Sequence, residues 1–139
     1  MKYSLSKDNK ESLVDKISTF LTEYQKEIIA VYLFGSFLTE HHFSDIDIGI
    51  LSIRNISQPL DFEIALESKL EKITGYPMDV RLINQTPLAF SQNVIKTGRV
   101  IVDMDPNKRA EFQGRILKEY FDFSRYHKRY LKEVVNAPV

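Results

Sequence analysis

The stretch that decides the fold is IIAVYLFGSFLTEHHFSDIDIGILSI, residues 28–53. Its first seven residues are β-branched, aliphatic or aromatic, which predicts a strand buried on both faces that ends at Gly35. Residues 44–53 alternate strictly, as in a half-buried strand, so side chains two apart share a face. The isoleucines fall on one face, and the other face carries Asp45, Asp47, Gly49 and Leu51.

Helical and strand patterns follow one another on both sides of this stretch. Apolar residues at three-and-four spacing predict helices, and short β-branched runs bounded by Gly or Pro predict strands. The expected elements are a helix over 12–24, strands over 28–34 and 44–53, a helix over 59–73, a strand over 77–83, a helix over 87–96, a strand over 99–104 and a long final helix over 106–135. This order predicts an α/β (α+β) fold in which helices flank a small mixed sheet.

The composition predicts one domain over residues 1–139. A chain of 139 residues with 43% hydrophobic residues can build one ordinary core but not two. Its formal net charge of zero does not favour nucleic acid or a membrane surface as a partner, although the charge is unevenly distributed, because residues 106–139 carry eight Lys or Arg against four Asp or Glu. There is no cysteine, no long apolar stretch and no apolar segment behind the charged start, so the expected location is cytoplasmic.

The paired carboxylates of Asp45 and Asp47 are the first candidate site. Period-two alternation places them on the same strand face, where they repel each other unless something compensates their charge. A divalent cation does this well, and magnesium is commonly held by one or two carboxylates together with substrate phosphates. Paired acids on an exposed strand face also occur in many proteins without a metal.

Two further features accompany the pair. Gly35 and Ser36 follow a strand directly, so free backbone N–H groups and the Ser hydroxyl are candidates for holding a phosphate. Asp79 lies on the strand predicted over 77–83, and it projects beside the pair if the two strands are neighbours. A third carboxylate would complete a site for two metal ions, with Asp79 as general base and metal ligand.

In this order, the motifs resemble those of the nucleotidyltransferase superfamily that includes DNA polymerase beta and kanamycin nucleotidyltransferase. Gly35-Ser36, Asp45-Ile46-Asp47 and Asp79 match its pattern of Gly-Ser, Asp-x-Asp and a later third Asp. The small size and the final helix look most like the minimal nucleotidyltransferases (MNT) encoded beside HEPN-domain ribonuclease toxins. The resemblance covers nearly the whole chain.

This resemblance implies an antitoxin that uses ATP and Mg²⁺ to transfer AMP onto a tyrosine of its HEPN partner. It implies Asp45, Asp47 and Asp79 as catalytic metal ligands, and Gly35 and Ser36 as nucleotide-binding residues. The chain departs from the pattern between Ser36 and Asp45, where FLTEHHFS is about two residues shorter than usual and lacks the Arg-Gly often found there. His41 and His42 lie in this connection, either as phosphate contacts or as exposed loop residues.

Arg81 and Arg99 are candidate triphosphate contacts. Arg81 shares a strand face with Asp79 two residues away. For Arg99, surface ion pairing is the favoured role.

The final helix carries more apolar residues than one buried face can use. Phe112, Ile116, Phe123, Tyr130 and Val134 share one face, which predicts core packing. Further apolar and basic residues surround that face, among them Leu117, Phe121, Tyr126, Arg125 and Lys128. Residues 106–135 are therefore also predicted to offer a docking surface for an acidic or aromatic partner. RNA binding by the same strip has no sequence motif behind it.

Two alternative functions stay open at this point. One is an antitoxin that neutralises its partner by binding and occlusion, with weak or absent catalysis. The other is transfer of a nucleotide to a small molecule such as an antibiotic. The sequence also leaves open whether the chain forms a homo-oligomer or a hetero-oligomer with a toxin.

Overall fold

The computed structural model describes residues 1–24 and 26–136, with the backbone alone for 133–136. Along the chain the elements are β1 (Tyr3–Ser4), α1 (Lys7–Thr22), β2 (Ile28–Phe34), α2 (Ser36–Thr39), β3 (His42–Phe43), β4 (Ile46–Ser52), α3 (Pro59–Thr74), β5 (Met78–Leu82), α4 (Leu88–Thr97), β6 (Arg99–Asp103) and α5 (Pro106–Asn136). The four central strands form a sheet in the order β5-β4-β2-β6. Strands β4 and β5 are parallel, and the other two pairings are antiparallel. The mixed sheet and long final helix predicted from the sequence are confirmed.

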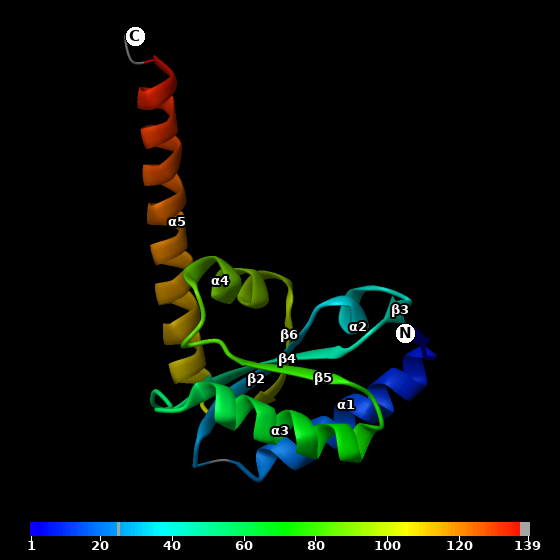
Figure 1. Ribbon diagram of the computed structural model, residues 1–139. Helices are drawn as coiled ribbons and strands as arrows, with labels where there is room; N and C mark the ends of the chain where they lie inside the picture. Colours follow the sequence, from blue (N-terminus) through cyan, green and yellow to red (C-terminus); the bar gives the residue numbers. More distant parts are fainter. Residues whose placement is uncertain (25, 137–139) are drawn as a thin grey trace.

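Helices cover both faces of this sheet (Figure 1). Alternation in β4 sends Ile46, Ile48 and Ile50 into a core shared with α1 and α3. The opposite face packs in a second core with α4 and the first turns of α5, where Leu51, Val94 and Phe112 meet. Every residue of β2 is buried, because this strand lies inside the sheet and between the two helical layers.

Two small strands, β1 and β3, were not predicted from the sequence. β1 pairs with β3, so that Tyr3 lies opposite Phe43 and closes a two-stranded sheet at one end of the molecule. α1 also begins five residues before the predicted start at Ser12, because Ser6 caps it by accepting a hydrogen bond from the Asn9 N–H at 3.2 Å. The first turn of α1 is polar and exposed, so apolar spacing could not reveal it.

Glutamates of α3 satisfy the outward backbone groups of the edge strand β5. Glu71 accepts a hydrogen bond from the Met78 N–H at 3.2 Å, and Glu63 accepts one from the Leu82 N–H at 2.7 Å. Between them, Val80 lies where its backbone acts to lower the pKa of Glu67, against the larger raising effect of burial. Glutamates four residues apart on α3 match backbone groups two residues apart on β5, because four helical residues rise about 6 Å and two strand residues rise about 6.6 Å.

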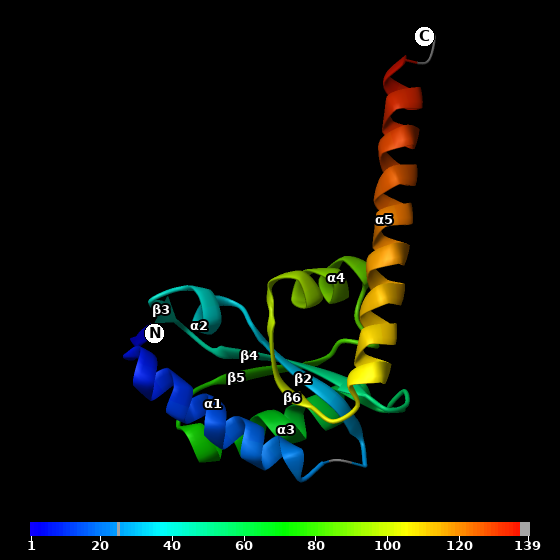
Figure 2. The same cartoon turned by 180° about the vertical axis from the view of Figure 1, so that it is seen from behind.

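The prediction of a core-facing stripe along α5 is half right. Phe112 and Ile116 are buried, but Phe123 and Tyr130 on the same face are more than half exposed. The side chain of Val134 lies outside the described part. A helix of 31 residues is about 46 Å long, and its second half rises past the sheet and α4 (Figures 1 and 2). No helix within residues 1–24 and 26–136 is long and apolar enough to cross a bilayer.

The two halves of α5 are expected to differ in what they contribute to stability. Ile116→Ala removes buried methyl groups and should lower the free energy of unfolding by about 2–4 kcal/mol. Phe123→Ala removes an exposed ring and should change it by less than about 0.5 kcal/mol. Urea unfolding of both variants measures the difference, and equal destabilisation would contradict the division of the helix.

Candidate active site

Three carboxylates converge at one end of the parallel pair β4 and β5. Asp47 lies on β4 directly opposite Asp79 on β5 in the strand register, and Asp45 immediately precedes β4. One carboxylate oxygen from each residue lies within 4.8 Å of the other two. All three side chains are half-buried rather than enclosed, so the cluster opens to solvent.

Gly35 lies against the carboxylate of Asp47. A Cβ atom built on Gly35 would stand 1.9 Å from Oδ2 of Asp47, and the φ angle of Gly35 is +78°. Both the close approach and the left-handed backbone favour glycine. The turn that ends β2 is thus packed directly on the acidic cluster.

The cluster carries a large electrostatic strain without a cation. Burial, and then the negative charges of Asp45 and Asp79, raise the pKa of Asp47 to about 7, while Arg81 opposes the shift. Burial and the charge of Asp79 also raise the pKa of Asp45. A site that disfavours its own negative charge gains most from a bound cation, and an all-oxygen donor set suits Mg²⁺ or Mn²⁺. The residues present therefore fit the metal that the sequence led us to expect.

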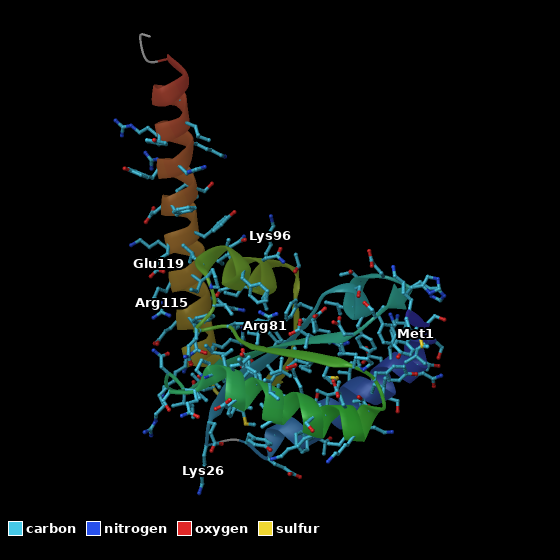
Figure 3. All side chains as sticks on the ribbon, viewed as in Figure 1. Met1, Lys26, Arg81, Lys96, Arg115 and Glu119 are labelled. Carbon is cyan, nitrogen blue, oxygen red and sulfur yellow. The ribbon has the colours of Figure 1, made fainter. Side chains whose placement is uncertain are left out.

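Arg81 pairs with one member of the cluster. Its Nε donates to Oδ1 of Asp79 at 2.9 Å, and the pKa of Arg81 is raised first by this hydrogen bond and then by the charge of Asp79. The guanidinium itself is about half exposed and lies over the ring of Phe90 at 5.9 Å (Figure 3). Arg81 can thus orient Asp79 through Nε, while the half-exposed guanidinium keeps further N–H donors.

The short connection between Ser36 and Asp45 is held from three directions. Phe37 and Phe43 pack edge to face at 4.9 Å, and β1 pairs with β3. Lys10 on α1 donates to the carbonyl oxygens of Phe37 and Glu40, both at 2.8 Å. Ser36 begins the single turn of α2 and is half-buried. The Ser36–Asp45 connection, which the sequence suggested was a shortened loop, is therefore fixed by contacts with β1 and α1.

The remaining candidates lie at the surface. His41 and His42 are exposed, with ring centroids 4.7 Å apart. Arg99 pairs with Glu11 on α1, as the surface interpretation predicted.

Sequence reasoning missed two residues near this region, Lys10 and Glu67. Burial first, and then the charge of Asp79 among others, raise the pKa of Glu67, which shows that this helical acid shares the electrostatic environment of the cluster. The four-residue spacing of glutamates on α3 was the available signal for Glu67. Nothing local signalled that Lys10 would reach the Ser36–Asp45 connection.

The family model described as Polymerase beta, Nucleotidyltransferase matches residues 15–107. The chain belongs to this family. Gly35, Ser36, Asp45, Asp47 and Asp79 all lie within the matched region, and the sequence resemblance to these nucleotidyltransferases is confirmed. No curated protein matches the chain.

Solved structures show the same nucleotidyltransferase fold. A chain of the toxin-antitoxin MntA-HepT is similar with a TM-score of 0.70 and 18% identity over 90% of this chain and 98% of that chain. A chain of the tri-AMPylated Shewanella oneidensis HEPN toxin in complex with MNT antitoxin gives 0.71 and 19% over 91% and 98%. A chain of a toxin-antitoxin with AMP-PNP gives 0.71 and 21% over 88% and 98%. At these identities the likeness establishes the fold.

Substitution of Gly35 should disturb the acidic cluster as well as the backbone. Gly35→Ala forces a methyl group into the carboxylate of Asp47, at a backbone conformation of φ 78° and ψ -164° that is essentially confined to glycine. Gly75→Ala, at φ 80° and ψ 10° with no atom within 4 Å, carries the lower αL backbone cost of about 1–2 kcal/mol, so the Mn²⁺ affinity is the measurement specific to the contact. We expect Gly35→Ala to lower the free energy of unfolding further than Gly75→Ala and to weaken Mn²⁺ binding, measured by calorimetry. Equal stability and unchanged Mn²⁺ affinity for both variants would refute the contact.

The raised pKa of Asp47 predicts that the metal-free protein becomes less stable as the pH rises. The pKa is 3.8 in the unfolded chain and about 7 in the folded one, so the folded state binds the extra proton and stability falls as the pH rises from about 4 to about 7. Asp47→Asn should therefore be more stable than the wild type at pH 8 in EDTA, by about 1–2 kcal/mol after discounting for solvent screening. Near pH 4 the two proteins should unfold at the same temperature.

Mg²⁺ should reverse the order of stability of the wild type and Asp47→Asn at pH 8. Added Mg²⁺ is expected to raise the unfolding temperature of the wild type and to affect Asp47→Asn much less, because that variant has lost a ligand. Scanning calorimetry at pH 8 with and without Mg²⁺ decides the matter. A stabilisation of equal size in both proteins would show that the ion binds elsewhere.

Proposed function

We propose that this protein is a Mg²⁺-dependent nucleotidyltransferase that transfers AMP from ATP to a tyrosine hydroxyl of a HEPN toxin and thereby neutralises it. The convergence of Asp45, Asp47 and Asp79 within 4.8 Å carries the proposal. Family membership supports the transferase chemistry. The structures of a tri-AMPylated HEPN toxin with MNT antitoxin and of a toxin-antitoxin with AMP-PNP support the nucleotide and the acceptor. ATP and a toxin of this kind imply a cytoplasmic location.

In this proposal Asp45, Asp47 and Asp79 would together hold two Mg²⁺ ions. The bound ions would neutralise the triphosphate and lower the pKa of the attacking hydroxyl. Backbone N–H groups at Gly35 and Ser36 would donate hydrogen bonds to phosphate oxygens. The tight turn at Gly35, which lies beside Asp47, places these N–H groups near the cluster.

Residues of the chain then accept the proton of the acceptor and orient the base that receives it. The tyrosine oxygen attacks the α-phosphorus of ATP, the bond from that phosphorus to the bridging oxygen breaks, and pyrophosphate leaves. Asp79 accepts the tyrosine proton as general base. Arg81 holds Asp79 through its 2.9 Å hydrogen bond, so the carboxylate is oriented before the acceptor arrives.

Transfer is tested by incubating the protein with radiolabelled ATP, Mg²⁺ and the HEPN protein encoded beside it. We expect label on the partner, located on tyrosine by mass spectrometry. Asp45→Asn and Asp47→Asn should each lower the rate by about 10³-fold, since each removes several kcal/mol of charge stabilisation. Asp61→Asn, an exposed acid on α3, is the matched control and should keep full activity. An unlabelled partner would exclude the transfer.

Neutralisation by occlusion is the second candidate function. The short Ser36–Asp45 connection lacks the Arg-Gly of related enzymes, which favours weaker phosphate contacts. The double variant Asp45→Ala plus Asp47→Ala separates the two functions in a growth assay with the toxin. Full protection by this variant would establish occlusion, whereas lost protection despite normal binding would establish catalysis.

A further inference from the structure

The start of the chain lies against the segments that carry the acidic cluster. In both views the N-terminus stands beside α2 and β3 (Figures 1 and 2). The pairing of β1 with β3 sets Tyr3 opposite Phe43, and Lys10 on α1 reaches the same connection. Residues 3–10 are called the N-terminal clamp. They precede residues 15–107, the part of the chain that the family model matches.

Tyr3 joins the two segments that lead into the strands of the cluster. Its ring centroid lies 5.7 Å from that of Phe43 and 5.0 Å from that of Tyr76, and the rings of Phe43 and Tyr76 lie 5.5 Å apart. Phe43 is followed two residues later by Asp45. Tyr76 is followed three residues later by Asp79. Three mutually packed rings therefore tie together the entries to β4 and β5, where the carboxylates lie.

Lys10 binds the backbone of the connection between Ser36 and Asp45. Its Nζ donates hydrogen bonds to the carbonyl oxygens of Phe37 and Glu40, both at 2.8 Å. Carbonyls at the end of a helix have no partner within the helix, and a lysine can satisfy them. The ammonium also lies 5.1 Å from the ring centroid of Phe37 and 5.5 Å from that of Phe43. One side chain thus contacts the connection near its start and near its end.

Lys10 has no acidic partner that competes with the backbone of α2. Among the side chains that the structure describes, no carboxylate lies within 4.0 Å of its ammonium. Residues 37–44 contain no Lys or Arg, although an Arg-Gly often follows the Gly-Ser in the enzymes that the chain resembles. The cation that meets this connection comes instead from α1.

The short helix α2 links Lys10 to the cluster. It is a single turn of four residues, too short to be stable without tertiary contacts. The N–H groups of Leu38 and Thr39 donate to the Gly35 carbonyl at 3.1 and 3.2 Å, so this turn is continuous with Gly35. Gly35 lies against the carboxylate of Asp47. A displaced α2 would therefore move the backbone that supports Asp47 and the N–H groups proposed to bind phosphate.

We infer that Tyr3 and Lys10 are positioning residues, which fix the nucleotide-binding turn and the entries to β4 and β5 before the ligands arrive. The part that concerns the nucleotide rests on the function proposed above. The part that concerns the metal rests on the carboxylate cluster alone. Order before binding matters because a displacement of about 1 Å can lower a rate by about 100-fold.

The role of Lys10 is tested by removing its charge while keeping its length. Lys10→Met deletes both hydrogen bonds to α2, Lys10→Arg retains a cation with several donors, and Lys16→Met removes the charge of an exposed lysine on the same helix. Calorimetry measures the affinity for AMP-PNP with Mg²⁺ at a temperature where circular dichroism shows each variant folded. We expect Lys10→Met to bind about tenfold more weakly, because two charged hydrogen bonds that order the turn are lost. Lys10→Arg and Lys16→Met should keep the wild-type affinity.

The role of Tyr3 is tested with Mn²⁺ alone, under the same conditions. Tyr3→Ala removes one of the three packed rings, whereas Tyr3→Phe keeps it. Tyr24→Ala is the matched control, because this half-buried ring packs on Phe20 at 5.5 Å, near the opposite end of α1. We expect Tyr3→Ala to weaken Mn²⁺ binding about fivefold, since the carboxylates lose their fixed spacing. Tyr3→Phe and Tyr24→Ala should bind Mn²⁺ as the wild type does.

Unchanged affinities would overturn the clamp. Wild-type AMP-PNP affinity in Lys10→Met, or an equal loss in Lys16→Met, would overturn the role of Lys10. Wild-type Mn²⁺ affinity in Tyr3→Ala, or an equal loss in Tyr24→Ala, would overturn the role of Tyr3.

Other outcomes separate this inference from the proposed function. If the wild type binds both ligands and the variants weaken as expected, but the HEPN protein stays unlabelled, AMP transfer is refuted and the clamp stands. A wild type that binds Mn²⁺ but no AMP-PNP would refute the nucleotide chemistry and the role of Lys10 together. The Mn²⁺ affinity of Tyr3→Ala would still decide the role of Tyr3.

Discussion

The parallel pairing of β4 with β5 is the constraint on which the site depends. Its register sets Asp47 against Asp79, and the two-residue period of β4 adds Asp45 to the same face. Three carboxylates this close oppose one another, and the fold holds them together because the other face of the same strands is locked into the core with Ile46, Ile48 and Val80. Burial of the isoleucines of β4 stabilises the strand enough to offset the electrostatic repulsion among the three carboxylates.

Contacts from several elements surround the cluster of Asp45, Asp47 and Asp79. Gly35 presses on Asp47 from the end of β2, and Arg81 orients Asp79 from within β5. The connection from Ser36 to Asp45 is fixed by the N-terminal strand and by Lys10. Each contact comes from a different element, so the cluster is positioned from several sides while one side stays open.

Much of the fold could be predicted from the sequence because the signals were local. Strict alternation in residues 44–53 predicted the shared face of Asp45 and Asp47, and the apolar run of residues 28–34 predicted the buried strand. The position of Asp79 required strand adjacency, which no local pattern contains and which the family resemblance supplied.

Phe123 and Tyr130 have the same spacing as Phe112 and Ile116, so periodicity alone predicted core packing for all four. Where the sheet ends, and therefore where the stripe on α5 loses its cover, is a property of the assembled fold. The same is true of β1 and β3, whose two-residue strands form only because distant segments meet.

The glutamates that α3 places along β5 have a consequence for how the protein meets other chains. An edge strand with unpaired N–H groups invites strand addition by a neighbouring chain and, from there, aggregation. Here the N–H groups of Met78 and Leu82 already donate to the carboxylates of Glu71 and Glu63. An incoming strand would have to displace these side chains before it could pair with β5. The hydrogen bonds from Glu63 and Glu71 therefore protect the β5 edge against strand addition.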